Sequence, residues 1–135
     1  SVFLSIKDKD KTKEMGEACK ILEKIGFKIL ATKGTKSFLD GKAIKSSFVK
    51  KVYEGRPNIV DLLKDKKIAI VMNTTEGKQS LEDSKDIRYF ALHNKIPYYT
   101  TARGIIATIH SLKENIGGKL SVKAIQEYHA QLIAD

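Results

Sequence analysis

The sequence predicts an α/β protein, a three-layer α/β/α sandwich around a central five-stranded parallel sheet. Short apolar runs alternate with amphipathic stretches of helical period along the chain. The apolar run at residues 68–73 is almost uninterrupted, which is typical of a strand covered on both faces. With 135 residues the chain has the size of one domain, so we expect residues 1–135 to form a single unit. Because it opens directly on a core strand, we also expect it to be a piece of a longer polypeptide.

The first part of the chain predicts two strands joined by a helix. The apolar residues at 2–6 form the first strand. Apolar side chains then recur at steps of three and four, which predicts an amphipathic helix from residue 10 or 12 to residue 25. Gly26 ends this helix, because glycine readily takes the left-handed conformation found at helix C-termini. Residues 27–32 form the second strand.

The middle of the chain predicts two short helices and two strands. A short helix is expected at residues 35–39, followed by a weak third strand at residues 48–53. Pro57 is placed for the start of a helix over residues 58–65, since proline is favoured at the first helical position. The apolar run at residues 68–73 then forms the fourth strand, which we expect at the centre of the sheet.

The last part of the chain predicts three helices and the fifth strand. A helix is expected from residue 80 or 82 to residue 94, and the strand at residues 96–100 follows it directly. Residues 102–112 form the next helix. The pair Gly117-Gly118 then predicts a flexible break, and residues 121–134 have the apolar spacing of a final amphipathic helix.

The net charge of +9 would suit a nucleic-acid-binding protein, but the kind of charge argues against it. Only three of the 25 basic residues are arginines, which most often read bases and phosphates, and the lysines are spread among acidic residues. We therefore expect a solvated lysine-rich surface and no nucleic-acid partner. The chain has no apolar run of about 18 residues and no visible signal peptide, which predicts a cytoplasmic protein without membrane contact.

Few residues have the pattern of a catalytic or metal site. Cys19 shares a helical spacing with apolar residues, so we expect a buried core thiol, and one cysteine allows no internal disulfide. His93, His110 and His129 each fall inside an expected helix, where a surface position is the favoured interpretation. No group of His, Asp and Glu has metal-ligand spacing, so we predict no metal and no cofactor in this domain.

Polar turns follow the expected strands, and two of them are alike. Residues 31–35 read Ala-Thr-Lys-Gly-Thr, and residues 73–78 read Asn-Thr-Thr-Glu-Gly-Lys. Glycine lets the backbone approach a ligand, a helix N-terminus presents free N–H groups, and threonine adds hydroxyls, so such turns suit a phosphate. The carboxyl ends of parallel strands share one edge of the sheet, where ligands of open α/β sheets bind. The chain is therefore expected to bind a phosphorylated small molecule.

The candidate binding residues come from the turns after all five expected strands. They are Lys11; Thr32, Lys33 and Thr35; Lys51; Asn73, Thr74 and Thr75; and Thr100 and Thr101. A threonine at such a place can instead cap a helix N-terminus, and this alternative stays open for Thr35 and Thr101. Asp83 can cap a helix, lie exposed, or face the sugar or base end of a ligand, because it would repel a phosphate.

Several segments, in order along nearly the whole chain, resemble one known family. The more specific segments are Lys-Val-Tyr-Glu-Gly-Arg-Pro at residues 51–57 and Asn-Thr-Thr at residues 73–75. They are accompanied by Phe-Leu-Ser-Ile at residues 3–6, Ala-Thr-Lys-Gly-Thr at 31–35, Tyr-Thr-Thr at 99–101 and Gln-Glu-Tyr-His-Ala-Gln at 126–131. The chain resembles the carboxy-terminal regulatory domain of the carbamoyl-phosphate synthetase large subunit, which has a methylglyoxal synthase-like fold.

This resemblance implies an allosteric domain that is itself non-catalytic. The parent enzyme of the family is a ligase that makes carbamoyl phosphate from bicarbonate, glutamine-derived ammonia and ATP, with Mg or Mn, for pyrimidine and arginine biosynthesis. Its regulatory domain binds a nucleotide monophosphate, UMP or IMP, and contacts the ornithine site. The implied partners are therefore these small molecules, the rest of the large subunit and a glutaminase small subunit.

The resemblance also implies roles for the candidate residues. Phosphate contacts are implied for Lys11, Thr32, Thr35 and Lys51, with Lys33 as an addition. Whether Lys11 or Lys13 reaches the phosphate stays open. Sugar- and base-side contacts are implied for Ser5, Asn73, Thr74, Thr75, Asp83 and Thr101. An ornithine contact is implied for Thr100.

A stand-alone lyase of the methylglyoxal synthase type is the alternative function. That enzyme has an Asp-Pro-Leu turn after its fourth strand and a His-Asp pair after its first. At the matching places this chain has Asn-Thr-Thr at residues 73–75 and Lys-Asp-Lys-Asp at residues 7–10. A general base has no obvious replacement here, so we expect binding without turnover.

Overall fold

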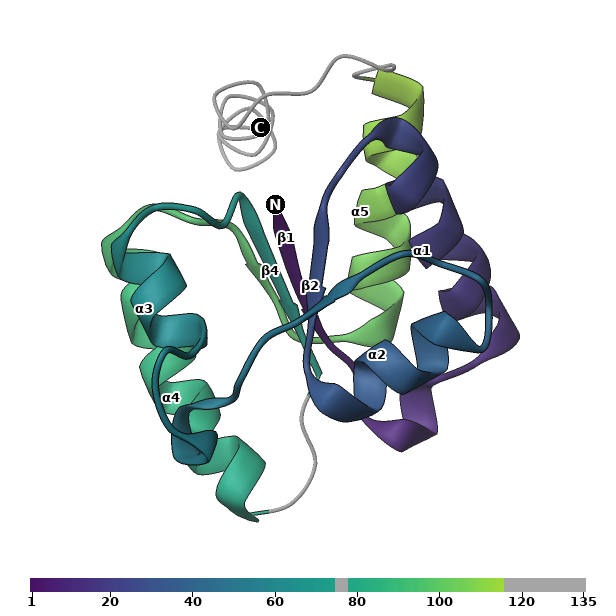
Figure 1. The fold of residues 1–135 in the computed structure, drawn as a ribbon. Coiled ribbons are helices and arrows are strands. Elements are labelled where there is room, and N and C mark those ends of the chain that lie inside the picture. The colour runs from purple at the N-terminus through teal and green to yellow at the C-terminus, as the bar shows by residue number, and fades with distance from the viewer. Residues whose placement is uncertain (75–77, 116–135) are drawn as a thin grey trace.

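The computed structural model describes residues 1–74 and 78–115 and contains a five-stranded sheet (Figure 1). The strands are β1 (Val2–Ser5), β2 (Ile29–Ala31), β3 (Ser47–Phe48), β4 (Ile70–Asn73) and β5 (Tyr98–Tyr99). Their order in the sheet is β3-β2-β1-β4-β5, and every neighbouring pair is parallel. The predicted five-stranded parallel sheet is confirmed. The strand order reverses between β1 and β4, the kind of place where open α/β sheets bind ligands.

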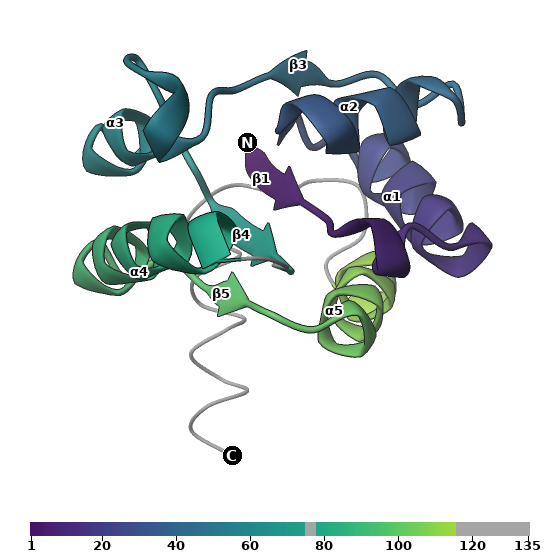
Figure 2. The same ribbon diagram turned by 90° about the horizontal axis from the view of Figure 1, so that it is seen from below.

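Helices cover both faces of this sheet and complete the predicted three layers. The helices are α1 (Lys13–Ile25), α2 (Lys33–Asp40), α3 (Ile59–Lys64), α4 (Lys78–His93) and α5 (Ala102–Asn115). Two short 3-10 helices are η1 (Asp8–Asp10) and η2 (Val52–Glu54). The helices α1, α2 and α5 lie on one side of the strands, and α3 and α4 lie on the other (Figure 2). The glycine pair at 117–118 and the helix predicted at 121–134 lie outside the described residues.

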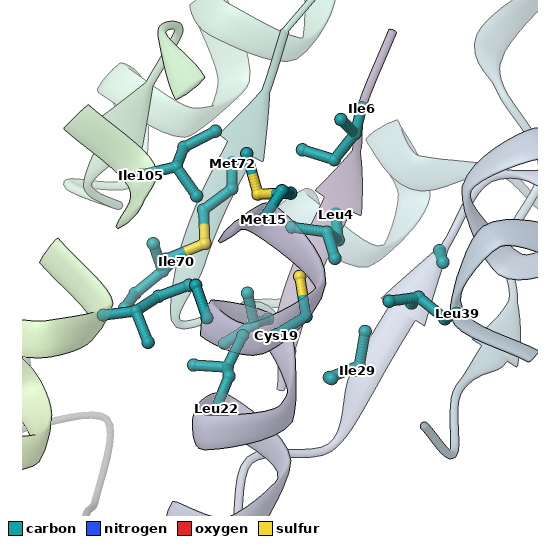
Figure 3. Packing of buried hydrophobic residues seen from close by; sticks show 14 of the residues in the cluster. Leu4, Ile6, Met15, Cys19, Leu22, Ile29, Leu39, Ile70, Met72 and Ile105 are labelled. Atoms are coloured by element: carbon teal, nitrogen blue, oxygen red, sulfur yellow. The ribbon is translucent and has the colours of Figure 1, made fainter. Parts of the chain in front are cut away.

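The core consists of two apolar clusters, one on each face of the sheet. Successive residues of β1 point to opposite faces, so Leu4 packs with α1 and α5 while Phe3 packs with α3 and α4. Met15, Cys19 and Leu22 of α1 lie against the sheet in the first cluster (Figure 3). The prediction of a buried core thiol is confirmed, because Cys19 is fully buried.

The third strand was predicted with the wrong bounds. It was expected at residues 48–53, but β3 is only Ser47–Phe48, pairs with β2 over these two residues, and is exposed. The chain then leaves the sheet: the carbonyl of Lys50 accepts a 3.0 Å hydrogen bond from the N–H of Ile59. The apolar side chains of Val49 and Val52 pack into the second cluster without a strand. Lys51 therefore lies in a loop before η2.

Several helix starts also differ from the predictions, among them that of α4, which begins at Lys78 and not at residue 80 or 82. The helix expected at residues 35–39 begins at Lys33, because Thr32 takes the extended backbone of an N-cap and its carbonyl accepts from the N–H of Lys36 at 2.8 Å. The later helix α3 starts after Asn58, whose side-chain oxygen accepts from the N–H of Val60 at 2.9 Å. Pro57 therefore precedes the cap instead of starting the helix.

Candidate functional site

Three of the predicted site residues meet where β1 and β2 end. The hydroxyl oxygen of Thr32 lies 3.3 Å from that of Ser5 and 3.2 Å from that of Thr35. The hydroxyl of Thr35 accepts a hydrogen bond from the N–H of Ile6 at 2.8 Å. Thr32 and Thr35 are almost completely buried. The result is a hydroxyl cluster, formed by the buried Thr32 and Thr35 and the half-buried Ser5, that ties the first turn of α2 to the end of β1.

The capping alternative is resolved differently for the two threonines. Thr35 lies within the first turn of α2, whose N-cap is Thr32, so the capping interpretation of Thr35 is wrong. Thr101 does cap a helix: its hydroxyl accepts a hydrogen bond from the N–H of Gly104 at 3.0 Å in the first turn of α5. Thr101 is exposed.

Lys11 reaches the first turn of α2 from the loop that follows β1. Its ammonium nitrogen lies 3.2 Å from the place that a Cβ atom on Gly34 would occupy. The absence of a side chain at Gly34 thus leaves room for the ammonium group. Lys13, the alternative, is the exposed first residue of α1. Of the two lysines, Lys11 is the one that lies against the N-terminus of α2.

Positive charge gathers beside this N-terminus. The ammonium of Lys11 pairs with the carboxylate of Asp8 at 2.5 Å. The pKa of Asp8 is lowered chiefly by this hydrogen bond and the charge of Lys11, and further by the charge of Lys51. Lys51 is held in its loop by Glu54, whose carboxylate accepts from its backbone N–H at 2.7 Å. Lys33 is exposed at the first residue of α2.

Asn73 and Thr74 extend the site from β1 towards β5. Asn73 is opposite Ser5 in the register of β1 and β4. Its side chain is buried, and its amide donates to the hydroxyls of Ser84 and Tyr98, each at 3.0 Å. Thr74 is also buried, and its hydroxyl accepts from the backbone N–H of Lys7 at 2.9 Å. The side chain of Thr74 is therefore turned to the chain that follows β1.

A groove of about 610 Å³ opens between the end of β5 and helix α4. Asn73, Tyr98 and Thr100 line it from the sheet. Residues of α4 line its other side and carry both signs of charge, namely Glu82, Lys85 and Arg88. The structure thus separates Thr100 from the hydroxyl cluster. The cluster is at β1 and β2, the groove is at β4 and β5, and Asn73 lies between them.

Sequence reasoning missed two residues of this region. Asp8 lies in the alternating Lys-Asp-Lys-Asp run at residues 7–10, and nothing in the local sequence distinguishes it from Asp10. The hydroxyl of Tyr98 meets Asn73 across 25 residues of sequence, a contact that only the sheet order creates. Thr75 and the side chain of Asp83 lie outside the described residues.

Residues 1–74 and 78–115 contain neither a cluster of metal ligands nor a helix that could cross a membrane. No group of three or more His, Cys, Asp and Glu side chains there could hold a metal ion. In the same ranges, no helix combines the length and the apolar character that a membrane crossing requires.

Comparison with known proteins supplies the family. The MGS-like domain model matches residues 14–100. The chain is 40% identical over 128 residues, 95% of its length, to the carbamoyl phosphate synthase large chain of Rhizobium meliloti (strain 1021). It is 44% identical over 128 residues, again 95% of its length, to that of Halomonas eurihalina, and 37% identical over 134 residues, 97% of its length, to that of Methanosarcina barkeri.

The matched region is a small part of these relatives. The chain spans 11% of the Rhizobium protein, 12% of the Halomonas protein and 33% of the Methanosarcina protein. The similarity therefore covers nearly all of this chain and a limited segment of each large chain. Together with the five-stranded parallel sheet, the match at residues 14–100 establishes the family. This chain belongs to the MGS-like domain family.

Proposed function

We propose that this chain is the allosteric effector-binding domain of a carbamoyl phosphate synthase large subunit and binds a nucleotide monophosphate, UMP or IMP. The observation that carries the proposal is the position of Lys11. Its ammonium lies over Gly34 in the first turn of α2. A fixed cation at a helix N-terminus is a favourable place for a phosphate, because the helix dipole and the free N–H groups add to its charge.

The phosphate would bind through the backbone as much as through side chains. The first N–H groups of α2, at Lys33 and Gly34, have no partner within the helix because of their position. Lys11 and Lys51 would supply the two charges that balance a phosphate dianion. The hydroxyls of Thr32 and Thr35 already bond within the hydroxyl cluster. Their part would be to hold the first turn of α2 in place, with Thr32 and Ser5 nearest the ligand.

The sugar and base would lie across β1 towards β4. Ser5 and Asn73 are direct neighbours in the sheet, at the reversal of strand order. Asn73 would offer its side-chain oxygen to the base or sugar, because its amide N–H groups already donate to Ser84 and Tyr98. The remaining proposed contacts are Thr74, Thr75, Asp83 and Thr101. Thr100 faces the separate groove at β5, which supports its assignment to a second ligand, proposed to be ornithine.

Regulation would require the effector to bind two states of the parent protein with different affinity. Coupling free energies of about 1–3 kcal/mol are typical of such systems. The ATP-dependent steps, with Mg or Mn, and the contact with a glutaminase subunit would belong to other parts of the proposed parent. The relatives are large chains of which this sequence matches a small share, which supports this division of roles.

Isothermal titration of the 135-residue chain with UMP, IMP and inorganic phosphate tests the proposal. We expect a nucleotide to bind more tightly than phosphate, and Lys11→Ala and Lys51→Ala each to weaken binding about tenfold, as loss of a charge-assisted hydrogen bond implies. Lys28→Ala is the matched control, because it removes the same charge from an exposed residue before β2, at the opposite edge of the sheet. Equal weakening in all three variants, or no binding by the wild-type chain, would contradict the proposal.

The lyase alternative is tested with the same preparation. Dihydroxyacetone phosphate is added and the release of methylglyoxal is measured. We expect no turnover, because Asn73 and Thr74 stand at the turn where that enzyme has its Asp-Pro-Leu sequence, and neither side chain is a general base. Sustained methylglyoxal production would replace the effector-binding proposal with an enzymatic one.

A further inference from the structure

Asp8 and Lys11 form an ion pair in which one side chain is largely buried and the other is exposed. They lie at the start of η1 and just after its end, and the carboxylate of Asp8 is 2.5 Å from the ammonium of Lys11. The side chain of Lys11 is 17% exposed, whereas that of Asp8 is 91% exposed. The cation is therefore packed in place, and the anion is free to turn into solvent.

This ion pair involves the same ammonium that lies over Gly34. A phosphate oxygen bonded to Lys11 would come close to the carboxylate of Asp8, and two anions repel each other at short range. The cations that act on Asp8 are Lys11 and, more weakly, Lys51, and they lower its pKa. The carboxylate thus interacts with the same two positive charges that would bind the proposed phosphate.

From this geometry we infer that Asp8 is a tethered competitor of the phosphate group. Its carboxylate pairs with Lys11 in the free chain and must leave that ammonium when a phosphorylated ligand binds. This inference rests on the proposed function and concerns the same site. The side chain of Asp8 is almost fully exposed, so it can move away from Lys11 with little loss of packing contacts. Asp8 therefore lowers the affinity for phosphate but does not block the site.

The chain offers a matched control within the same turn. Asp10 belongs to η1 as well, but its carboxylate pairs with Lys7 at 3.8 Å and not with Lys11. Asp8→Asn and Asp10→Asn change the net charge by the same amount and keep the size of the side chain. Any difference between the two variants therefore reports the contact with Lys11 and not the overall charge.

The test is calorimetric titration of the 135-residue chain, its Asp8→Asn variant and its Asp10→Asn variant with inorganic phosphate and with UMP. Exposed ion pairs are weak, so we expect Asp8→Asn to tighten binding of both ligands about threefold and Asp10→Asn to leave it nearly unchanged. In a Lys11→Ala background, Asp8→Asn should no longer tighten the binding of phosphate or UMP, because the carboxylate of Asp8 then has no Lys11 ammonium to pair with.

The outcomes separate this inference from the proposed function. If the wild-type chain binds UMP but Asp8→Asn binds no better than Asp10→Asn, the competitor role is overturned and the effector site stands. Weaker binding in Asp8→Asn would also overturn it, since Asp8 would then help to position Lys11. If neither the wild-type chain nor Asp8→Asn binds phosphate or UMP, both proposals fail together.

Discussion

The hydroxyl of Thr35 accepts a hydrogen bond from the backbone N–H of Ile6 at 2.8 Å, which joins α2 to the chain just after β1. The two residues are 29 positions apart in sequence, and both are almost fully buried. The first turn of α2 is therefore anchored in the core and does not depend on a loose loop. A ligand at this turn would meet backbone N–H groups that are already in position, which lowers the cost of ordering on binding.

Replacing Thr35 with valine should destabilise the chain. Valine keeps the size of the side chain but leaves the buried N–H of Ile6 without its acceptor, which costs about 1–3 kcal/mol in the free energy of unfolding. Urea denaturation followed by circular dichroism measures this cost. Thr35→Ser retains the hydroxyl and should lose less stability than Thr35→Val. Equal stability of Thr35→Val and the wild-type chain would show that the hydrogen bond is unimportant.

Replacing Gly34 with alanine should weaken the binding of phosphate without lowering the stability of the chain. Alanine has a higher helix propensity than glycine, which favours stability by up to about 1 kcal/mol. Its Cβ atom, however, would lie 3.2 Å from the ammonium of Lys11, which is tighter than an ordinary contact, so the ammonium would have to shift away from its place beside α2. We expect an unchanged or higher melting temperature together with several-fold weaker binding of phosphate. A variant that binds phosphate as well as the wild-type chain would show that Lys11 does not act at this position.

Arg56→Gln should change how stability depends on pH. The pKa of Asp61 is lowered first by its hydrogen bond from Arg56, at 2.6 Å, and then by the backbone N–H of Asn58. A carboxyl with a lowered folded-state pKa adds stability above its ordinary pKa, and this stability is lost as the pH falls through the folded value.

The melting temperatures of Arg56→Gln and the wild-type chain should therefore differ most near neutral pH and converge below about pH 4. An NMR titration of the Asp61 carboxyl in both proteins checks the cause directly, and its pKa should be higher in the variant. A difference in melting temperature that persists unchanged to low pH would mean that Arg56 acts through packing and not through Asp61.

Cys19 should be unreactive in the folded chain. Its burial raises the pKa of the thiol to about 12, so almost no thiolate exists near pH 8. Labelling with a disulfide reagent at pH 8 should be at least about a hundredfold slower in the native protein than in denaturing urea. Labelling at the same rate in both conditions would show that the side chain is accessible.

The sequence predicts best those parts of the fold in which neighbouring residues form a clear apolar pattern. The almost continuous apolar run gives β4 as a buried strand, but it lies beside the middle strand β1 and not at the centre of the sheet as expected. The apolar spacing gives α1, which ends at Gly26 in the left-handed conformation expected of it. The third strand was misplaced because Val49, in the loop after β3, and Val52, at the start of η2, pack against the core, and their apolar character resembles that of a strand.

The sequence predicts at which edge of the sheet the candidate site lies, but it does not predict which side chains contact one another there. Parallel strands bring Ser5, Thr32 and Asn73 to one edge. Thr32 and Asn73 were expected there from their places at the ends of strands, whereas Ser5 was implied only by the family resemblance. The pairing of Asn73 with Tyr98 depends on the order of β4 and β5, and the pairing of Asp8 with Lys11 depends on a 3-10 turn. Neither of these two residue pairs is marked by a sequence pattern that distinguishes its members from ordinary surface residues.

The most direct test of the central claim is an NMR titration of the isotopically labelled 135-residue chain with UMP. Backbone amide shifts report where a ligand binds, residue by residue. We predict the largest changes at Lys33, Gly34 and Thr35, with further changes at Lys11 and Asn73. A response confined to residues at the opposite edge of the sheet, such as Lys28, or the absence of any saturable response, would contradict the assignment of an effector site to the N-terminus of α2.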